Sequence, residues 1–366
     1  MGLESSDLSL PARPLVQDQF GSPFTSASEI LSHLAAASVS YWKSFRYQLE
    51  EAGCRVLVWF IPRLSRRACI RLANGVGAIA FAVDRRGRSV ALDNLECAFG
   101  ERYTPEQRAR IAKRSYQNFA RTMLDLFWAA CLDTQNYKQW IYMEGFAEAR
   151  QQMAAEHRGA VFSCSHFGNW EWANIGGGFA GSEAVTVAEN FKNPRLTNIF
   201  KGLREHSGAT LIPQENSLLR MLKAAKRGKV TSLMVDLNLP PSQASTVIET
   251  FRDPAHGQEG LMMCVSVLHA VLAQRAESFL VPVETQPSED GTCRVIVHPP
   301  LEVDKEDSLR ILAQKCWDAF EPFIRARPEL YLWSYKHFRC RPKNAARPYP
   351  AYSNTNSKFE KLLRET

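Results

Sequence analysis

The chain has 366 residues, of which 45% are hydrophobic and 23% are charged. This composition is typical of a globular protein with a substantial core, in one large domain or two ordinary ones. The mean hydropathy of −0.27 excludes a polytopic membrane protein. The nine cysteines form no C-x-x-C pair. This argues against a zinc site or a disulfide framework and predicts a reducing compartment.

The net charge of +7 is concentrated in two segments of the chain. Residues 55–88 hold eight arginines against Asp84, and residues 192–229 hold nine lysines and arginines against Glu205 and Glu215. Basic segments of this kind attract phosphate groups on a membrane surface, on a phosphorylated ligand or on nucleic acid. Aromatic side chains are not interleaved with them as in RNA-recognition motifs, so nucleic-acid binding is not expected.

Residues 1–40 are expected to form a flexible extension that lacks the pattern of a secretory signal peptide. Residues 41–145 are expected to form a helical, basic region. Its apolar runs, Val56–Ile61 and Leu72–Val83, are too short to span a bilayer. Because they alternate with arginine clusters, they predict helices that lie in a membrane interface. The alternative is a helical pair packed on the body, with its arginines in solvent.

One helix in this region is predicted over residues 105–131. The segment Thr104–Gln107 supplies an N-cap residue, a proline at the first helical position and a glutamine at the third. Apolar side chains then recur at helical spacing and predict a buried face that belongs to the core. These are Phe119, Met123, Leu126 and Phe127.

Residues 146–345 are expected to form an α/β core, a mostly parallel sheet flanked by helices, and residues 346–366 a C-terminal tail. The strand candidates are residues 160–164, 185–188, 230–235, 279–284 and 294–298. The helix candidates are residues 194–206, 217–228, 259–275 and 307–326.

The segment Val161–Glu171 is where chemistry is expected. A strand ends there and delivers His166, a loop with a glycine follows, and Glu171 comes five residues after the histidine. Within one helix the two side chains would point roughly 140° apart. With His166 at the strand end and Glu171 in the next helix, the carboxylate can instead hold one imidazole nitrogen. The other nitrogen is then left to take a proton from a hydroxyl.

A purely structural role for His166 and Glu171 is the alternative. Other chemistries are less well supported by the sequence. It contains no G-x-S-x-G, H-E-x-x-H or Walker A motif, and the glycine run Gly176–Gly178 lies after the 166–171 string, where it suits helix packing or a break. A serine hydrolase, a metal site and a nucleotide cofactor are therefore not expected.

The string His-Phe-Gly-Asn-Trp-Glu at 166–171 closely resembles the H-x4-D/E signature of glycerolipid acyltransferases. Its form is typical of the late acyltransferases of lipid A biosynthesis, the lauroyl and myristoyl transferases, and of the related phosphatidylinositol mannoside acyltransferases. Further similar elements are Asp93–Leu95 with Ala98–Phe99, Asn193–Pro194 with Arg204, Asp236, and Arg327–Ser334 with Phe338 and Arg341–Pro342. The chain departs from the family pattern at Gly100, at Leu237–Asn238 and at Phe251–Asp253.

The resemblance implies an O-acyltransferase of the glycerolipid acyltransferase fold that needs no cofactor. The acyl chain would pass from the thioester of an acyl carrier protein or of coenzyme A to a hydroxyl of a membrane glycolipid, such as a lipid A precursor. His166 would be the general base and Glu171 its orienter, with Arg204 or a backbone N–H near Gly168–Asn169 as the oxyanion donor. The expected substrate-binding residues are Gly168, Asn169, Asn193, Arg204, Asp236 and Arg339.

The resemblance also implies interfacial binding to the cytoplasmic face of a bacterial inner membrane. Two alternatives stay open at this stage. One is another acceptor, such as a mannolipid, an amino-acid lipid or a lysophospholipid. The other is a lipid-binding homologue without turnover, which the altered elements around Asp236 and at Phe251–Asp253 favour and the intact 166–171 string opposes.

Overall fold

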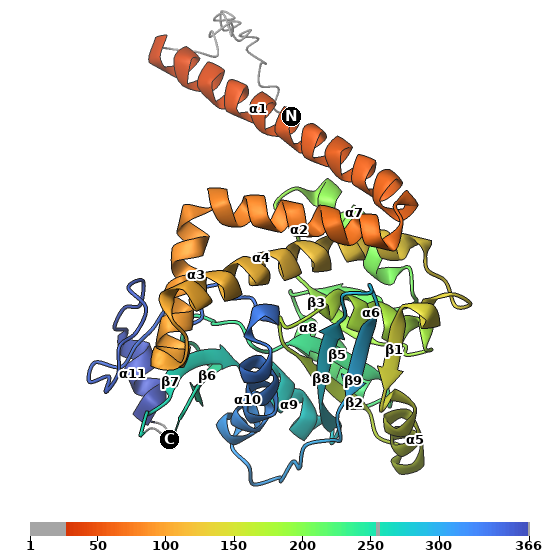
Figure 1. Cartoon of the computed structure of the whole chain (residues 1–366), viewed down its shortest axis with the longest axis vertical. Helices are drawn as coiled ribbons and strands as arrows, with labels where there is room; N and C mark the ends of the chain where they lie inside the picture. Colours follow the sequence, from red (N-terminus) through yellow and green to blue (C-terminus); the bar gives the residue numbers. More distant parts are fainter. Residues whose placement is uncertain (1–26, 254–256, 365–366) are drawn as a thin grey trace, which may run out of the picture. The chain divides into compact units, whose positions relative to one another are not determined.

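The computed structural model describes residues 27–253 and 257–364, with side chains from residue 42 onward (Figure 1). Its contacts divide the chain into two units, residues 1–50 and 51–366, each considered by itself. The described part of the first unit belongs to helix α1, Ala27–Phe60, which ends in the second unit. The expected boundary at residue 40 thus falls inside a helix. Residues 1–26 of the predicted extension lie outside the described residues.

The second unit begins with helices, as the alternating apolar and basic runs predict. The short helix η1 (Ile61–Arg63) leads into α2 (Arg66–Val83) and α3 (Arg85–Phe99). Helix α4 (Pro105–Trp128) then packs along α2 (Figure 1). Its predicted start is confirmed, because the Thr104 hydroxyl and the Gln107 side chain each accept the other residue's backbone N–H.

The prediction that the buried face of α4 is apolar core is only partly right. Leu126 and Phe127 are buried, but Phe119 is 40% exposed. A second buried face of α4 is polar and includes Asn118, Thr122 and Asp125. Burial of polar groups is tolerated only where they are hydrogen-bonded, and these three bind the loop that carries the 166–171 string.

The predicted α/β class is confirmed by a seven-stranded sheet in the order β1-β9-β8-β2-β5-β3-β4. All neighbouring strands in it are parallel except β8 and β9. The strands are β1 Ile141–Glu144, β2 Ala160–Cys164, β3 Val185–Ala188, β4 Thr210–Pro213, β5 Val230–Met234, β8 Phe279–Pro287 and β9 Cys293–Val297.

Helices cover both faces of this sheet because its strands are apolar on both sides. Successive residues of β2 illustrate this: Val161 packs into one apolar cluster with α9 and α10, and Phe162 packs into another with α6. The helices of the core are α5 Phe146–Glu156, α6 Trp170–Phe179, α7 Pro194–Glu205, α8 Ser217–Ala225, α9 Leu268–Arg275 and α10 Leu309–Ala326, and α11 Ser357–Arg364 lies in the C-terminal segment.

The helix predicted over residues 259–275 is wrong in its first half. Residues Leu261–Ser266 form strand β7, which pairs antiparallel with β6 (Ser245–Thr250) beside the main sheet. A short, continuous apolar run suits a buried strand as well as a buried helix, and its periodicity does not separate them. Within the residues that the structure describes, no helix combines the length and the apolar character that crossing a membrane requires.

Candidate active site

Two neighbouring parallel strands bring a histidine and a carboxylate together. In the pair formed by β2 and β5, Cys164 lies opposite Met234, and the ladder continues as the Val235 N–H donates to the Cys164 carbonyl at 3.0 Å. His166 and Asp236 each follow two residues later. Both therefore emerge at the carboxyl edge of the sheet, where α/β proteins bind their ligands.

Asp236 holds His166 at two points. One carboxylate oxygen lies 2.8 Å from Nδ1 of the imidazole, and the other accepts the His166 backbone N–H at 2.9 Å. Burial would raise the pKa of Asp236, but the charge of His166 and these hydrogen bonds outweigh it and keep the pKa below its ordinary value. The ionised carboxylate places the proton on Nδ1. Nε2 is then free to accept a proton.

Two buried residues near the carboxylate of Asp236, Tyr331 and His337, were not predicted from the sequence as site residues. Tyr331 is buried, and burial together with the nearby Asp236 raises its pKa well above the ordinary value. Its hydroxyl lies 3.3 Å from Nδ1 of the buried His337, whose Nε2 lies 2.8 Å from the Leu332 carbonyl. Tyr331 stands within the C-terminal motif that the resemblance singled out, which was the available signal.

Glu171 has a different partner from the one expected. Arg204 of α7 donates to both of its carboxylate oxygens, from Nε at 2.8 Å and from Nη2 at 2.6 Å. The structure therefore corrects the predicted pairing: Asp236 holds the imidazole of His166, and Glu171 forms a buried ion pair with Arg204. Glu171 lies in the first turn of α6, where its charge is also favoured by the helix dipole.

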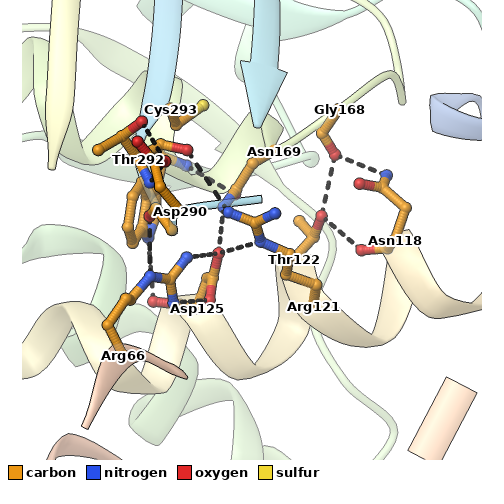
Figure 2. Close-up of polar contacts among 12 residues, drawn as sticks. Arg66, Asn118, Arg121, Thr122, Asp125, Gly168, Asn169, Asp290, Thr292 and Cys293 are labelled. Atoms are coloured by element: carbon orange, nitrogen blue, oxygen red, sulfur yellow. Dashed lines mark hydrogen bonds and ion pairs between the residues drawn. The ribbon is translucent and has the colours of Figure 1, made fainter. Parts of the chain in front are cut away.

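Gly168 and Asn169 shape the loop between the histidine and α6. The Gly168 N–H donates to the Leu330 carbonyl at 3.0 Å, so it is not available as an oxyanion donor. The side chain of Asn169 caps α6 by accepting the Trp172 N–H, and its amide donates to Asp125 at 2.7 Å (Figure 2). Among the described residues, no acceptor binds the backbone N–H of Asn169.

The two remaining predicted site residues, Asn193 and Arg339, make other contacts. Asn193 is buried and caps α7, accepting the Arg195 N–H at 3.1 Å. Asn193 therefore stabilises the start of α7, the helix that carries Arg204. Arg339 is exposed, and its guanidinium lies 5.4 Å from the centre of the Tyr335 ring.

A buried aspartate that holds a half-buried histidine at the carboxyl edge of a parallel sheet is an arrangement that can support general-base chemistry. A family model described as bacterial lipid A biosynthesis acyltransferase matches residues 44–340. The chain belongs to this family and is an acyltransferase.

The chain is also similar to a bacterial protein of known name. It is 24% identical over 308 residues to the lipid A biosynthesis lauroyltransferase of Escherichia coli (strain K12). The aligned part covers 83% of this chain and 95% of that protein. The similarity therefore extends over nearly the whole of the relative.

Proposed function

We propose that this acyltransferase moves a fatty acyl chain from a carrier thioester, of an acyl carrier protein or of coenzyme A, to a hydroxyl of a lipid A precursor. The observation that carries the proposal is the His166–Asp236 pair at the carboxyl edge of the sheet, where no described residue hydrogen-bonds Nε2 of His166. Membership of the family and similarity to a lauroyltransferase support the substrate class.

In the proposed reaction, Nε2 of His166 takes the proton of the acceptor hydroxyl as its oxygen attacks the thioester carbonyl carbon. The tetrahedral intermediate collapses, the carbon–sulfur bond breaks, and the leaving thiolate receives the proton from the imidazolium. Asp236 stabilises that imidazolium through Nδ1. No covalent bond to the enzyme forms at any step.

Arg204 and Asn169 are the proposed sources of oxyanion and substrate contacts. The side chain of Arg204 stays 20% exposed beyond its ion pair with Glu171. It lines a pocket of about 260 Å³ with Lys201, Phe191 and Phe200, next to the ends of β3 and β4. The backbone N–H of Asn169 is the second candidate oxyanion donor, and such donors stabilise the developing charge.

The proposal is tested by acyl transfer in membranes from cells that express the full-length chain. Acyl donors of several chain lengths, on acyl carrier protein and on coenzyme A, are added together with a lipid A precursor. The masses of the lipid products are then measured by mass spectrometry. We expect a product that is heavier than the precursor by one acyl chain and that forms with only one of the two carriers. If the protein binds the lipid without turnover of any donor, the proposal fails in favour of a lipid-binding homologue.

The two carboxylates of the site are expected to behave differently on substitution. Asp236→Asn removes a charge that stabilises the imidazolium and should lower the rate about 10–100-fold, the range expected for a hydrogen bond to a charged group. It should also move the acidic limb of the pH–rate profile to lower pH. Glu171→Gln should leave that limb in place, because its partner is Arg204. A shifted limb in Glu171→Gln alone would contradict this assignment.

We further propose that α2 lies on the cytoplasmic surface of a bacterial inner membrane. Its outer face carries an exposed apolar stripe at helical spacing, Leu72, Val76, Ile79 and Val83. Exposed arginines flank this stripe and suit anionic lipid headgroups: Arg67, Arg71, Arg85 and Arg86.

An aromatic series joins this helical side to the candidate site. The ring of Phe119, on the surface of α4, lies 6.1 Å from that of Trp170, which lies 5.0 Å from the imidazole of His166. Because α4 packs along α2, this series leads from the helices proposed to meet the membrane toward the His166–Asp236 pair. A lipid acceptor would then have a short path from the leaflet to His166.

Membrane binding is expected to depend on the stripe of α2. Ile79→Glu should lower binding to vesicles of phosphatidylglycerol and phosphatidylethanolamine by about tenfold, because an apolar side chain is lost from the bilayer. Leu219→Glu on α8 is a matched control, since Leu219 is 69% exposed and Ile79 is 64% exposed. Equal flotation of the wild type and Ile79→Glu would rule out this surface.

A further inference from the structure

Helix α4 presents a line of polar side chains toward the loops of the active site. Ser115, Asn118, Thr122 and Asp125 are spaced three, four and three residues apart, so they share one helix face. All four are buried. Figure 2 shows the last three pointing from α4 toward Gly168 and Asn169.

The carbonyl of Gly168 is held by two of these side chains. The Asn118 amide donates to it at 3.0 Å, and the Thr122 hydroxyl lies 2.9 Å from it. Gly168 has a φ of +63°, and a Cβ at this position would lie 2.0 Å from the Thr285 carbonyl oxygen. The loop is thus clamped between α4 and β8, in a conformation that requires glycine.

Asp125 holds the next residue of the loop. Its carboxylate accepts the Asn169 amide at 2.7 Å, and its backbone carbonyl accepts the indole N–H of Trp172 at 3.1 Å. Asn169 caps α6 with its other side-chain atom. The contact with Asp125 therefore fixes the start of the helix that carries Glu171.

The carboxylate of Asp125 is itself held in place by two arginines. Arg66 binds both of its oxygens and also donates to the Gly291 carbonyl at 2.8 Å. Nε of Arg121 lies 3.5 Å from the same carboxylate. The guanidinium of Arg66 also lies over the rings of Trp128 and Trp172. A carboxylate bound on several sides gives Asn169 a rigid acceptor.

We infer that Asn118, Thr122 and Asp125 are positioning residues for the acyl-transfer step. They contact the loop between His166 and Glu171 and act through Gly168 and Asn169. Their role is to hold the imidazole, the Asn169 N–H and the Glu171–Arg204 pair in one arrangement. A displacement of about 1 Å in such an arrangement costs up to roughly 100-fold in rate. This inference rests on the proposed function.

Thr122 allows a test that leaves the shape of the core unchanged. Thr122→Val removes the hydroxyl from the Gly168 carbonyl and should lower kcat about 3–10-fold, with both KM values unchanged, as for one lost hydrogen bond. Thr122→Ser restores the hydroxyl and should return kcat to within about twofold of the wild type. Asn169→Ser, which still caps α6 but does not reach Asp125, should lower kcat in the same way.

Gln117→Ala is the matched control on the same helix. The Gln117 amide donates to the Asn74 carbonyl at 3.1 Å, which ties α4 to α2 and not to the loop. Its kcat should match that of the wild type even if its melting temperature falls as far as that of Thr122→Val. A kcat that is unchanged in Thr122→Val, or lowered equally in Thr122→Ser, overturns the inference and leaves the proposed function standing. Absence of turnover by the wild type with every donor overturns the proposed function itself.

Discussion

Replacement of His166 by alanine is expected to lower the rate of acyl transfer by about 10²–10⁴-fold, the usual contribution of a general base. Nε2 of His166 is the proposed proton acceptor, and Asp236 holds Nδ1 at 2.8 Å. Alanine also removes the cation that returns the proton to the leaving thiol. The measurement is product formation per amount of enzyme in membranes, at saturating donor.

His157→Asn serves as the control for loss of a histidine. His157 is exposed at the end of α5 and has a φ of +52°, which asparagine tolerates. His157 lies before the amino end of β2, whereas His166 follows the carboxyl end of the same strand. Its activity should equal that of the wild type. Transfer that persists in His166→Ala, at wild-type expression and vesicle binding, would remove His166 from the mechanism.

Asp125→Ala is expected to destabilise the protein by about 3–5 kcal/mol, because it leaves buried positive charge without its partner. Arg66 and Arg121 are 5% and 9% exposed, so solvent does not replace the lost carboxylate. Asn169 loses its acceptor as well. The free energy of unfolding of the purified full-length chain, from urea titration in detergent, measures the effect.

A double substitution separates this ion pair from the positioning role. Arg66→Met with Asp125→Leu removes two of the three buried charges. It should recover part of the stability, since apolar residues replace buried ion pairs at little cost, and only part, because Arg121 remains without its carboxylate. It should not recover kcat, because leucine does not accept the Asn169 amide. Glu148→Ala, at an exposed carboxylate on α5, should change stability by less than about 0.5 kcal/mol. A stable Asp125→Ala variant would contradict the prediction.

Several elements could be predicted because their signals are local. The start of α4 depends on four consecutive residues, Thr104–Gln107, and strand β2 on an apolar run of five. The missed strands lack such signals. These are β1, β4, β6 and β7, and β7 is an apolar run that also suits a helix. Their conformation follows from the neighbouring strands with which they pair.

The identity of the carboxylate beside His166 shows why a local motif is insufficient. Glu171 is close in sequence and was expected to orient the imidazole, whereas Asp236 lies 70 residues away and does so. Asp236 directly follows the strand predicted over 230–235, but the sequence does not state which strand lies next to β2. The register of β2 and β5 decides it.

The sequence by itself determined the fold class, the family resemblance and the position of His166, because these depend on short patterns of residue type along the chain. The tertiary structure alone decided the partners: Asp236 for His166, Arg204 for Glu171, and Asp125 for Asn169. The physical reason is that hydrogen bonds and ion pairs depend on distances of about 3 Å between atoms. Only strand register and helix packing set those distances for residues far apart in the chain.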